Sequence, residues 1–343
     1  MPQVQLGLTL PYEGSLSFND AVELTRQAES AGFHSVWVPE AYGTDAISML
    51  GALAASTARI RLGTGIVNVF SRTPALLAQT AATLDLISGG RFILGLGTSG
   101  HQVISGWHGV PFEQPLQRMR ETVAIVRQVL RRERLEFRGE VFDLKQGLKI
   151  LAHPVRPAVP IFLATLTPGG LRLTGELADG WIPTLFAPDH VDLFRAHLEE
   201  GARKSGRSLA SLEIAPHVPL MIDEDRGRAR DALRPWAALY IGGMGSREKN
   251  FYNDLVQRYG FADDARRIQD LYLTGKKLEA IRLVPDALMD AIAIAGPSGH
   301  VQERLHHWGA AGVTLLLADL QAKTLSDRLK TIEILATAAA AVH

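Results

Sequence analysis

The chain has 343 residues, of which 46% are hydrophobic and 21% charged, and its 36 basic side chains balance its 36 acidic ones. This composition is that of a globular protein and excludes disordered, collagen-like and disulfide-scaffold classes. With no net charge, nucleic acid and anionic membranes are unfavourable partners, and a small-molecule ligand is favoured. The sequence contains no cysteine, which excludes disulfides, thiolate nucleophiles and thiolate metal sites.

Short apolar runs alternate with amphipathic stretches of helical period. This order is typical of β/α units around a parallel sheet that is buried on both faces, and we predict a (β/α)8 barrel. The eight predicted strands cover residues 4–8, 35–38, 60–67, 92–97, 160–164, 180–182, 212–222 and 313–318. Helices are predicted to begin near Phe18, Asp45, Thr73, Pro115, Thr167, Asp189, Pro297 and Thr324.

We predict one domain over residues 1–343, because an α/β barrel often fills a chain of this length. Residues 131–150 are predicted to form a short insertion, and residues 223–290 a helical insertion between strands seven and eight. No signal peptide or membrane span is expected, since no basic segment precedes an apolar stretch at the start and no stretch is long and apolar enough to cross a bilayer. A cytoplasmic protein is therefore expected.

A glycine-rich segment, residues 95–100, matches the pattern G-x-G-x-x-G and follows a predicted strand. In a dinucleotide-binding fingerprint the last glycine opens a helix at once, whereas here the next helix starts only near Pro115. We therefore interpret the segment as a barrel loop. Glycines at the carboxyl end of a strand let the backbone approach a ligand, which makes Thr98, Ser99 and Gly100 candidate binding residues.

Two further strand ends carry candidate binding residues. The segment 63–74 runs from a strand into a loop with glycines, and it is either simple strand punctuation or a wall for a flat ring. Residues 165–170 follow a strand that ends at Ala164 and open a helix, where free N–H groups and the helix dipole favour an anion. Ordinary helix capping by a threonine is the alternative explanation for that segment.

Three side chains near the predicted strand ends could exchange a proton. Glu40 ends the second strand, and His101 and His108 lie in the loop after the fourth strand. A carboxylate or imidazole at the carboxyl face of a barrel can act as acid or base, although each of the three could equally be a solvated loop residue. The histidines show no metal-binding spacing such as H-E-x-x-H, so no metal site is predicted.

Several of these segments together resemble the luciferase-like oxidoreductases, and within them the branch that uses the deazaflavin coenzyme F420. The resemblance covers nearly the whole chain and includes a similarity to methylenetetrahydromethanopterin reductase. It is carried by residues 62–68, 79–85, 88–97, 175–181, 285–290 and 312–314.

The resemblance implies a TIM barrel of the bacterial luciferase type and hydride transfer between the deazaflavin and a small organic substrate. It also implies a non-proline cis peptide within residues 65–67 against the ring, a phosphate tail held by residues 98–101 and 165–170, and a homodimer formed through helices two and three. Glu40 and His101 are the expected acid/base residues. The expected cofactor-binding residues are Glu40, Gly65, Ile66, Val67, Asn68, Thr98, Ser99, Gly100, His101, Ala164, Thr165, Gly169 and Gly170.

Three departures from the family pattern bear on the proton donor and on the class of substrate. Thr9 stands where the methanopterin reductases carry a glutamate, Glu40-Ala41 replaces an acid-histidine pair, and Gly100 replaces the catalytic glutamate of the sugar-phosphate dehydrogenases. Glucose-6-phosphate oxidation is therefore not predicted. Two alternatives remain open: an FMN-dependent monooxygenase on the same fold, and a noncatalytic flavin-binding protein.

Overall fold

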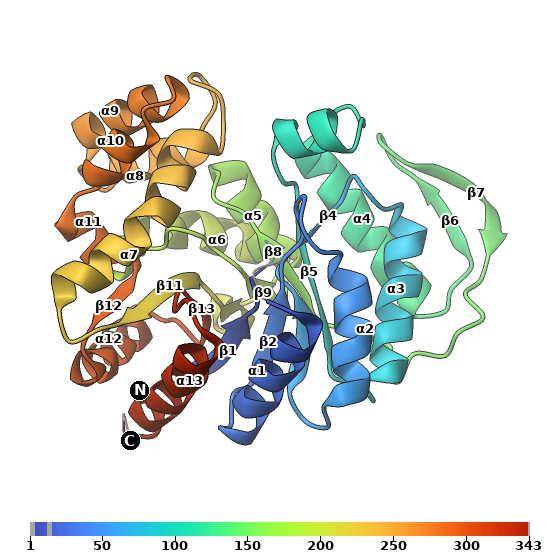
Figure 1. Cartoon of the computed structure of the whole chain (residues 1–343). Coiled ribbons are helices and arrows are strands. Elements are labelled where there is room, and N and C mark those ends of the chain that lie inside the picture. Colours follow the sequence, from blue (N-terminus) through green and yellow to red (C-terminus); the bar gives the residue numbers. More distant parts are fainter. Residues whose placement is uncertain (1–3, 12–15, 342–343) are drawn as a thin grey trace. The chain divides into compact units, whose positions relative to one another are not determined.

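The computed structural model describes residues 4–11 and 16–341, and the chain forms two compact units. We call them the N-terminal unit, which contains Gly7–Ile182 and Arg195–Glu213, and the C-terminal unit, which contains Met1–Leu6, Pro183–Phe194 and Ile214–His343. In both units, helices alternate with parallel strands, as the sequence predicts (Figure 1). In the part of the chain that the structure describes, no helix has both the length and the apolar character needed to cross a membrane.

The sheet of the N-terminal unit is parallel throughout and almost completely buried. Its strands therefore all end at one side, which we call the carboxyl edge, and begin at the opposite side, the amino edge. A short strand, β4 (Val67–Asn68), follows β3 and pairs with β5. The strands pair in the order β1 (Gln5–Thr9), β2 (Ser35–Val38), β3 (Arg61–Thr64), β5 (Phe92–Gly97), β8 (Ile161–Ala164) and β9 (Gly180–Trp181).

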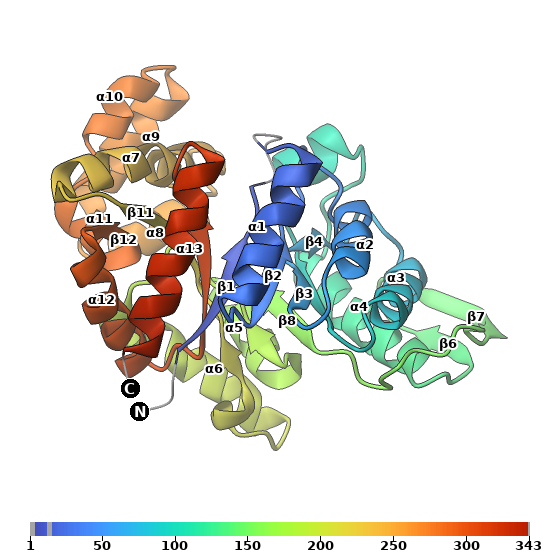
Figure 2. The same ribbon diagram turned by 60° about the horizontal axis from the view of Figure 1, so that its bottom comes forward.

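Most helices of this unit begin at a capping side chain. Ser17, Asp45, Thr73 and Thr167 each accept a hydrogen bond from a first-turn amide, which satisfies a donor that the helix cannot satisfy itself. Successive helices pack along the sheet, as Figure 2 shows for α1 to α4. The helices are α1 (Phe18–Ser30), α2 (Ala46–Ser56), α3 (Pro74–Ile87), α4 (Pro115–Leu130), α5 (Pro168–Leu177) and α6 (Asp192–Lys204), with the π-helix η1 (Gln102–Trp107) before α4.

Residues 131–150 contain an antiparallel hairpin of β6 (Leu135–Arg138) and β7 (Asp143–Leu148). The buried carboxylate of Glu121 on α4 accepts the backbone N–H groups of Glu140, Val141 and Phe142 at 2.7–3.0 Å. Burial alone would raise the pKa of Glu121, but the hydrogen bonds from Gln117 and these amides outweigh it and lower the pKa. The hairpin turn is thus anchored to the body of the unit by one ionised side chain.

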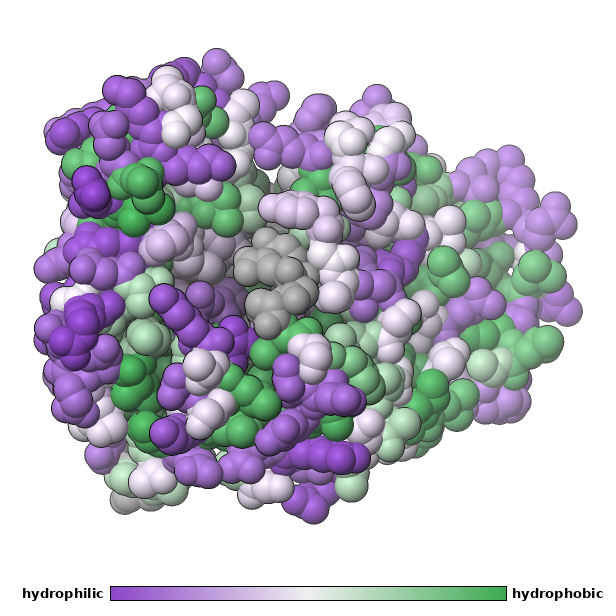
Figure 3. Space-filling model, in the orientation of Figure 1, coloured by the Kyte–Doolittle hydropathy of each residue, from purple (hydrophilic) through white to green (hydrophobic). Residues whose placement is uncertain are grey.

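The C-terminal unit has a parallel sheet in which β11 (His217–Ile222) lies between β12 (Ile294–Gly296) and β13 (Leu315–Leu320). The chain between β11 and β12 is helical, and its outer helices present a mostly hydrophilic surface (Figure 3). The helices between β11 and β12 are α7 (Arg226–Ala238), the π-helix η4 (Leu239–Gly243), α8 (Phe251–Arg258), α9 (Ala262–Leu273), α10 (Lys277–Arg282) and α11 (Asp286–Ile292). The helix α12 (Ser298–Ala310) follows β12, and α13 (Leu325–Ala340) follows β13.

Several boundaries differ from the sequence prediction by one or two residues, and four differences are larger. The strand predicted over residues 60–67 is divided at Gly65 and Ile66, and the strand predicted over residues 212–222 is divided between β10 (Glu213–Ile214) and β11. Pro216 lies at the second break and has no amide hydrogen to give to a neighbouring strand. The helix predicted near Asp189 begins at Asp192, after a 3-10 turn, and strands β6, β7 and β12 were not predicted.

Candidate functional site

The carboxyl edge of the N-terminal unit brings several predicted site residues together. Parallel pairing places Asn68 of β4 beside Gly97 of β5, and Gly97 beside Ala164 of β8. The backbone N–H of Glu40, just after β2, donates to the carbonyl of Ile66 at 3.2 Å. Strand register therefore collects residues from four separate segments of the chain.

Ile66 forms the centre of a wall built from small residues. The peptide bond between Gly65 and Ile66 is cis, which confirms the location expected from the resemblance. A Cβ atom at Gly97 would lie 2.8 Å from Cδ1 of Ile66, and a Cβ atom at Gly95 would lie 1.9 Å from the carbonyl oxygen of Thr64. Glycines on β5 are therefore required for the close approach of this segment, and Ala164 keeps the adjoining position small.

Buried polar atoms without a protein partner mark the same edge. Thr9 ends β1 and Asn68 ends β4, and neither Oγ1 of Thr9 nor Nδ2 of Asn68 has a hydrogen-bond partner in the protein. Oγ of Ser71 and Nε2 of His108 are also buried and have no hydrogen-bond partner in the protein. Leaving such a group buried and unpaired costs about 1–3 kcal/mol, so a bound polar ligand at this edge is a physical explanation for them.

Asn68 is held in a fixed orientation. Its Oδ1 accepts the backbone N–H groups of Phe70 and Ser71 at 3.0 and 2.7 Å, and the residue is 1% exposed. Because the oxygen is used by the backbone, the side chain can offer only its N–H₂ group to a ligand. A flat ring with carbonyl and ring-nitrogen acceptors along one side fits this donor.

The carboxylate of Glu40, a predicted acid/base residue, is paired with an arginine. Both of its oxygens accept hydrogen bonds from the guanidinium of Arg72, at 2.5 and 2.9 Å, and Oε2 also accepts the N–H of Ala46. Arg72 further contacts Asp45 at 2.6 Å, and its hydrogen bond to Glu40 raises the pKa of the guanidinium. This forked pair suits a fixed carboxylate that holds two loops together better than a proton donor.

The loop after β5 is open to solvent. Ser99 has a positive φ of 55°, and a Cβ atom at Gly100 would meet no neighbour within 4 Å. His101 is exposed at the start of η1, where its ring makes an edge contact with Phe112 at 6.3 Å between centroids. The loop thus leaves backbone and one imidazole accessible at the carboxyl edge.

The loop after β8 is used differently from the sequence expectation. The hydroxyl of Thr165 is buried and hydrogen-bonds to Thr174 inside α5 at 2.7 Å, so it is not available at the edge. Thr167 caps the N–H of Gly170 at 3.2 Å. A Cβ atom at Gly170 would lie 2.9 Å from Cβ of Thr165, so packing inside the loop requires this glycine. What stays available is the backbone near Gly169 at the start of α5.

Sequence reasoning missed three participants at this edge. Thr9 was noted only as a departure from a family pattern, and Ser71 and Arg72 were not singled out. The signal was weak, because a single threonine, serine or arginine is ordinary in a loop. Only the pairing of the strands shows that Thr9 ends beside β2, and only side-chain contacts show that Arg72 reaches Glu40.

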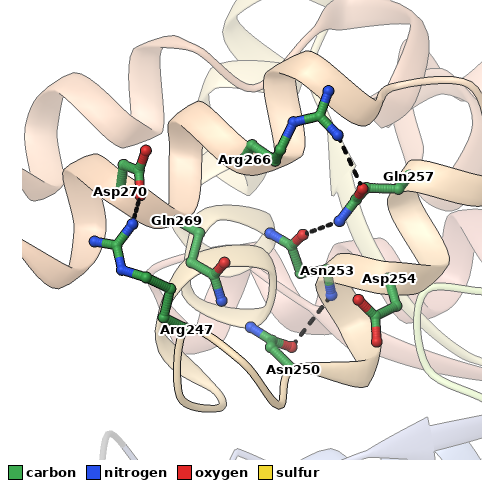
Figure 4. A pocket seen from close by; sticks show the side chains of 8 residues that line it. All are labelled: Arg247, Asn250, Asn253, Asp254, Gln257, Arg266, Gln269 and Asp270. Carbon is green, nitrogen blue, oxygen red and sulfur yellow. Dashed lines mark hydrogen bonds and ion pairs between the residues drawn. The ribbon is translucent and has the colours of Figure 1, made fainter.

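A separate polar pocket of about 280 Å³ lies in the C-terminal unit, between α8 and α9 (Figure 4). Arg247 forms an ion pair with Asp270, and Arg266 donates to Gln257 at 3.3 Å. Nδ2 of Asn253 donates to two backbone carbonyls at 3.0 and 2.7 Å. These side chains hold the helices together, so we interpret the pocket as a packing feature.

The fold is a (β/α)8 barrel of the luciferase-like type. A solved tetrahydromethanopterin reductase from Methanopyrus kandleri, described as coenzyme F420 dependent, matches with a TM-score of 0.84 and 26% identity over 97% of each chain. A solved F420-dependent secondary alcohol dehydrogenase matches with a TM-score of 0.82 over 99% of each chain, and at 22% identity it supports the fold alone.

Residues 4–315 match the family of luciferase-like monooxygenases, and the chain belongs to this family. A Mycobacterium tuberculosis protein provisionally named a coenzyme F420-dependent oxidoreductase is 40% identical over 92% of this chain and 94% of its own length. The 5,10-methylenetetrahydromethanopterin reductase of Archaeoglobus fulgidus is 31% identical over 85% of this chain and 86% of its own.

Proposed function

We propose that this protein is an oxidoreductase that uses coenzyme F420 to transfer a hydride to or from a small organic substrate. The observation that carries the proposal is the carboxyl edge of the N-terminal unit, where a wall of small residues lies beside unpaired buried donors. Relatives at 40% and 31% identity that are named for this coenzyme or for a reductase support the choice. When bound, the deazaflavin supplies the two-electron chemistry, and the protein supplies binding and orientation.

The ring is proposed to lie against Ile66, with Gly65 and Val67 shaping the wall and Ala164 leaving room beside it. The N–H₂ group of Asn68 donates to the polar side of the ring, and the hydroxyl of Thr9 is a second partner. These contacts place a flat group at the edge and exclude water from one of its faces. A fixed orientation of this kind accounts for a large part of the rate of a two-reactant step.

The tail is proposed to lie over the loops after β5 and β8. Thr98, Ser99 and Gly100 offer half-buried backbone, and Gly169 offers the start of α5, where the helix dipole favours a negative group; Gly170 shapes this loop, since its N–H is capped by Thr167. Thr165 contributes through the shape of the loop rather than through its hydroxyl, because that hydroxyl is paired with Thr174.

Two residues are proposed to serve the reacting group. A ring nitrogen of His101 gives or takes the proton, since this imidazole is exposed at the edge and is supported by Phe112. Glu40 is proposed as a positioning residue, because its carboxylate is bound by Arg72 and its amide holds the carbonyl of Ile66.

The test is a fluorescence titration with coenzyme F420 beside FMN. We expect saturable binding of F420 and binding of FMN at least tenfold weaker. G97A pushes Cβ against Ile66 and is expected to weaken F420 binding at least tenfold. The matched control is G299A, because Gly299 lies exposed on α12 with open space around it. Tighter binding of FMN, together with oxygen consumption driven by reduced FMN, would replace the proposal by a monooxygenase, which the name of the family favours.

Binding without turnover is the remaining alternative. If F420 binds but no candidate substrate oxidises or reduces it in stopped-flow absorbance, the protein is a noncatalytic binder. If a substrate does turn the coenzyme over, a proton-transfer role of His101 predicts that H101N slows coenzyme bleaching at least tenfold and leaves the affinity for F420 unchanged.

We also propose that the protein forms a homodimer through α2 and α3. Leu76, Leu86 and Ile87 on α3 are each more than 40% exposed, and an interface over this helix would remove these apolar side chains from water. Sedimentation should give twice the mass of the chain, and L86E with I87E should give the monomer. A wild-type monomer at micromolar concentration would contradict this proposal.

A further inference from the structure

A histidine and an aspartate face each other inside the C-terminal unit, and the proposed function uses neither of them. His217 lies on β11 and Asp319 on β13, with 3.5 Å between Nε2 and Oδ2. Parallel register places His217 opposite Leu317, and side chains two residues apart on a strand point to the same face. The pair is therefore set by the sheet and not by a loop.

The environment of the pair keeps the imidazole neutral. Burial lowers the pKa of His217 more than the nearby carboxylate raises it, and burial raises the pKa of Asp319. Gln321 and Arg328 act in the opposite direction on Asp319, and Nε of Arg328 donates to the carbonyl of Ala322 at 2.7 Å. With Nε2–H directed at the carboxylate, Nδ1 is an acceptor. Nδ1 is buried and has no partner in the protein.

Aromatic rings cover the pair from the helical region. The ring of Trp236 on α7 lies 6.1 Å from that of His217, and Tyr240 lies 4.7 Å from Trp236. Tyr252 on α8 meets Tyr240 edge-on at 4.9 Å. His217 is the first residue of β11 and Trp236 lies near the end of α7, so the rings lie over the amino end of β11. The side chains of the pair remain 15% and 13% exposed, so the pair lies close to the surface although Nδ1 itself is covered.

We propose that His217, Asp319 and the ring of Trp236 form a binding site for an uncharged organic alcohol. The hydroxyl of the ligand donates to Nδ1 of His217, and its apolar body packs against Trp236 and Tyr240. Asp319 orients the imidazole, as a carboxylate commonly does for a functional histidine. An anion is disfavoured beside this carboxylate, and a cation would pair with Asp319 and leave Nδ1 unused. The site is argued independently of coenzyme F420.

The test uses the whole chain without coenzyme and benzyl alcohol as the probe. Titration of protein labelled with 15N-histidine should move the His217 ring signals saturably and should change tryptophan fluorescence over the same concentrations. H217F keeps a ring but has no acceptor, and it should bind benzyl alcohol at least tenfold more weakly. Toluene, which lacks the hydroxyl, should bind wild type and H217F equally.

The control variant is H300F, because His300 pairs with Glu303 on α12 at 3.1 Å and is not part of the proposed site. It should bind benzyl alcohol like the wild type. No saturable shift up to the solubility limit of benzyl alcohol overturns the proposal, since the unpaired nitrogen is then satisfied by water alone. Tighter binding of benzylammonium than of benzyl alcohol also overturns it. If H217F fails to fold, the two probes on the wild type decide the question: benzyl alcohol should bind more tightly than toluene, and equal affinities overturn the proposal.

Discussion

The two edges of the sheet in the N-terminal unit differ in how their polar groups are hydrogen-bonded. At the amino edge, the carboxylate of Glu29 accepts the N–H groups of residues 58–60, and the guanidinium of Arg91 donates to three backbone carbonyls of residues 54–60 and to the hydroxyl of Thr57. At the carboxyl edge, Thr9 and Asn68 keep buried polar atoms without a protein partner. The same strands thus have one end where buried polar groups are satisfied within the protein and one end where some of them are not.

The comparison separates two kinds of cost. A saturated buried group stabilises the fold and is expensive to remove, whereas an unpaired buried group is a burden on the free protein until a ligand satisfies it. Variants at the amino edge should therefore change stability and leave ligand binding alone. Variants of the unpaired groups at the carboxyl edge should do the reverse.

The largest effect is expected at Asp85, which is fully buried near the amino edge. Its carboxylate accepts three hydrogen bonds from Arg156, at 2.5–2.9 Å. D85A leaves the guanidinium without its counter-charge and should lower the free energy of unfolding by about 3 kcal/mol in urea denaturation. E133Q, which breaks the exposed pair of Arg131 and Glu133, should leave the free energy of unfolding nearly unchanged. Equal losses of stability in D85A and E133Q would contradict a special stabilising role of the buried Asp85–Arg156 pair.

An intermediate effect is expected at Arg72, which lies at the carboxyl edge but is paired within the protein, to Glu40. R72M removes the fork from Glu40, whose side chain is only 9% exposed, and should cost about 2 kcal/mol of unfolding free energy. R72K keeps the charge but cannot form both hydrogen bonds, so it should cost about 1 kcal/mol. If R72M and R72K were equally stable, the forked geometry would have no role.

The matched pair T9V and T57V tests the comparison most directly. T9V removes an unpaired hydroxyl, so the free protein should be as stable as the wild type, while the affinity for coenzyme F420 should fall about tenfold. T57V removes a hydroxyl that donates to the carbonyl of Leu53 and accepts from Arg91. It should cost about 1 kcal/mol of stability with no change in affinity. The comparison of the two edges fails if both variants lose the same property.

The smallest effect is a pH dependence at His34, which precedes β2 at the amino edge. Burial, helped by the charge of Arg61, lowers its pKa to about 4. Between the ordinary value of 6.5 and about 4, the unfolded chain binds more protons than the folded one, so stability falls as the pH falls through this window. After a discount for partial exposure, H34Q should remove about 1 kcal/mol of that acid-induced loss, as measured by urea denaturation from pH 7 to 4.

Much of the N-terminal unit was predictable because its signals are local. The strand over residues 92–97 and the strand over residues 35–38 match the prediction at both ends, since an apolar run bounded by polar residues needs no partner to be identified. The helix starts at Thr73-Pro74 and Thr167-Pro168 are also as predicted, because a capping hydroxyl and a proline act within one turn.

The side-chain partners were not predictable from the chain alone. Glu40 meets Arg72 across 32 positions, and Arg156 meets Asp85 across 71. Such pairs depend on strand register and helix packing, and nothing in the neighbouring sequence distinguishes a clamped carboxylate from a solvated one. The same reason explains why Thr165 was expected to donate to a ligand and instead bonds to Thr174.

The sequence by itself determined the alternation of strands and helices and several helix starts, and it supplied the candidate loops for a ligand. The tertiary structure decided which polar groups in those loops remain unpaired, and it brought His217 and Asp319 together from strands about a hundred residues apart. The physical reason is that apolar periodicity and capping act over a few residues, whereas each buried hydrogen bond is chosen among all the groups that the folded chain brings within reach.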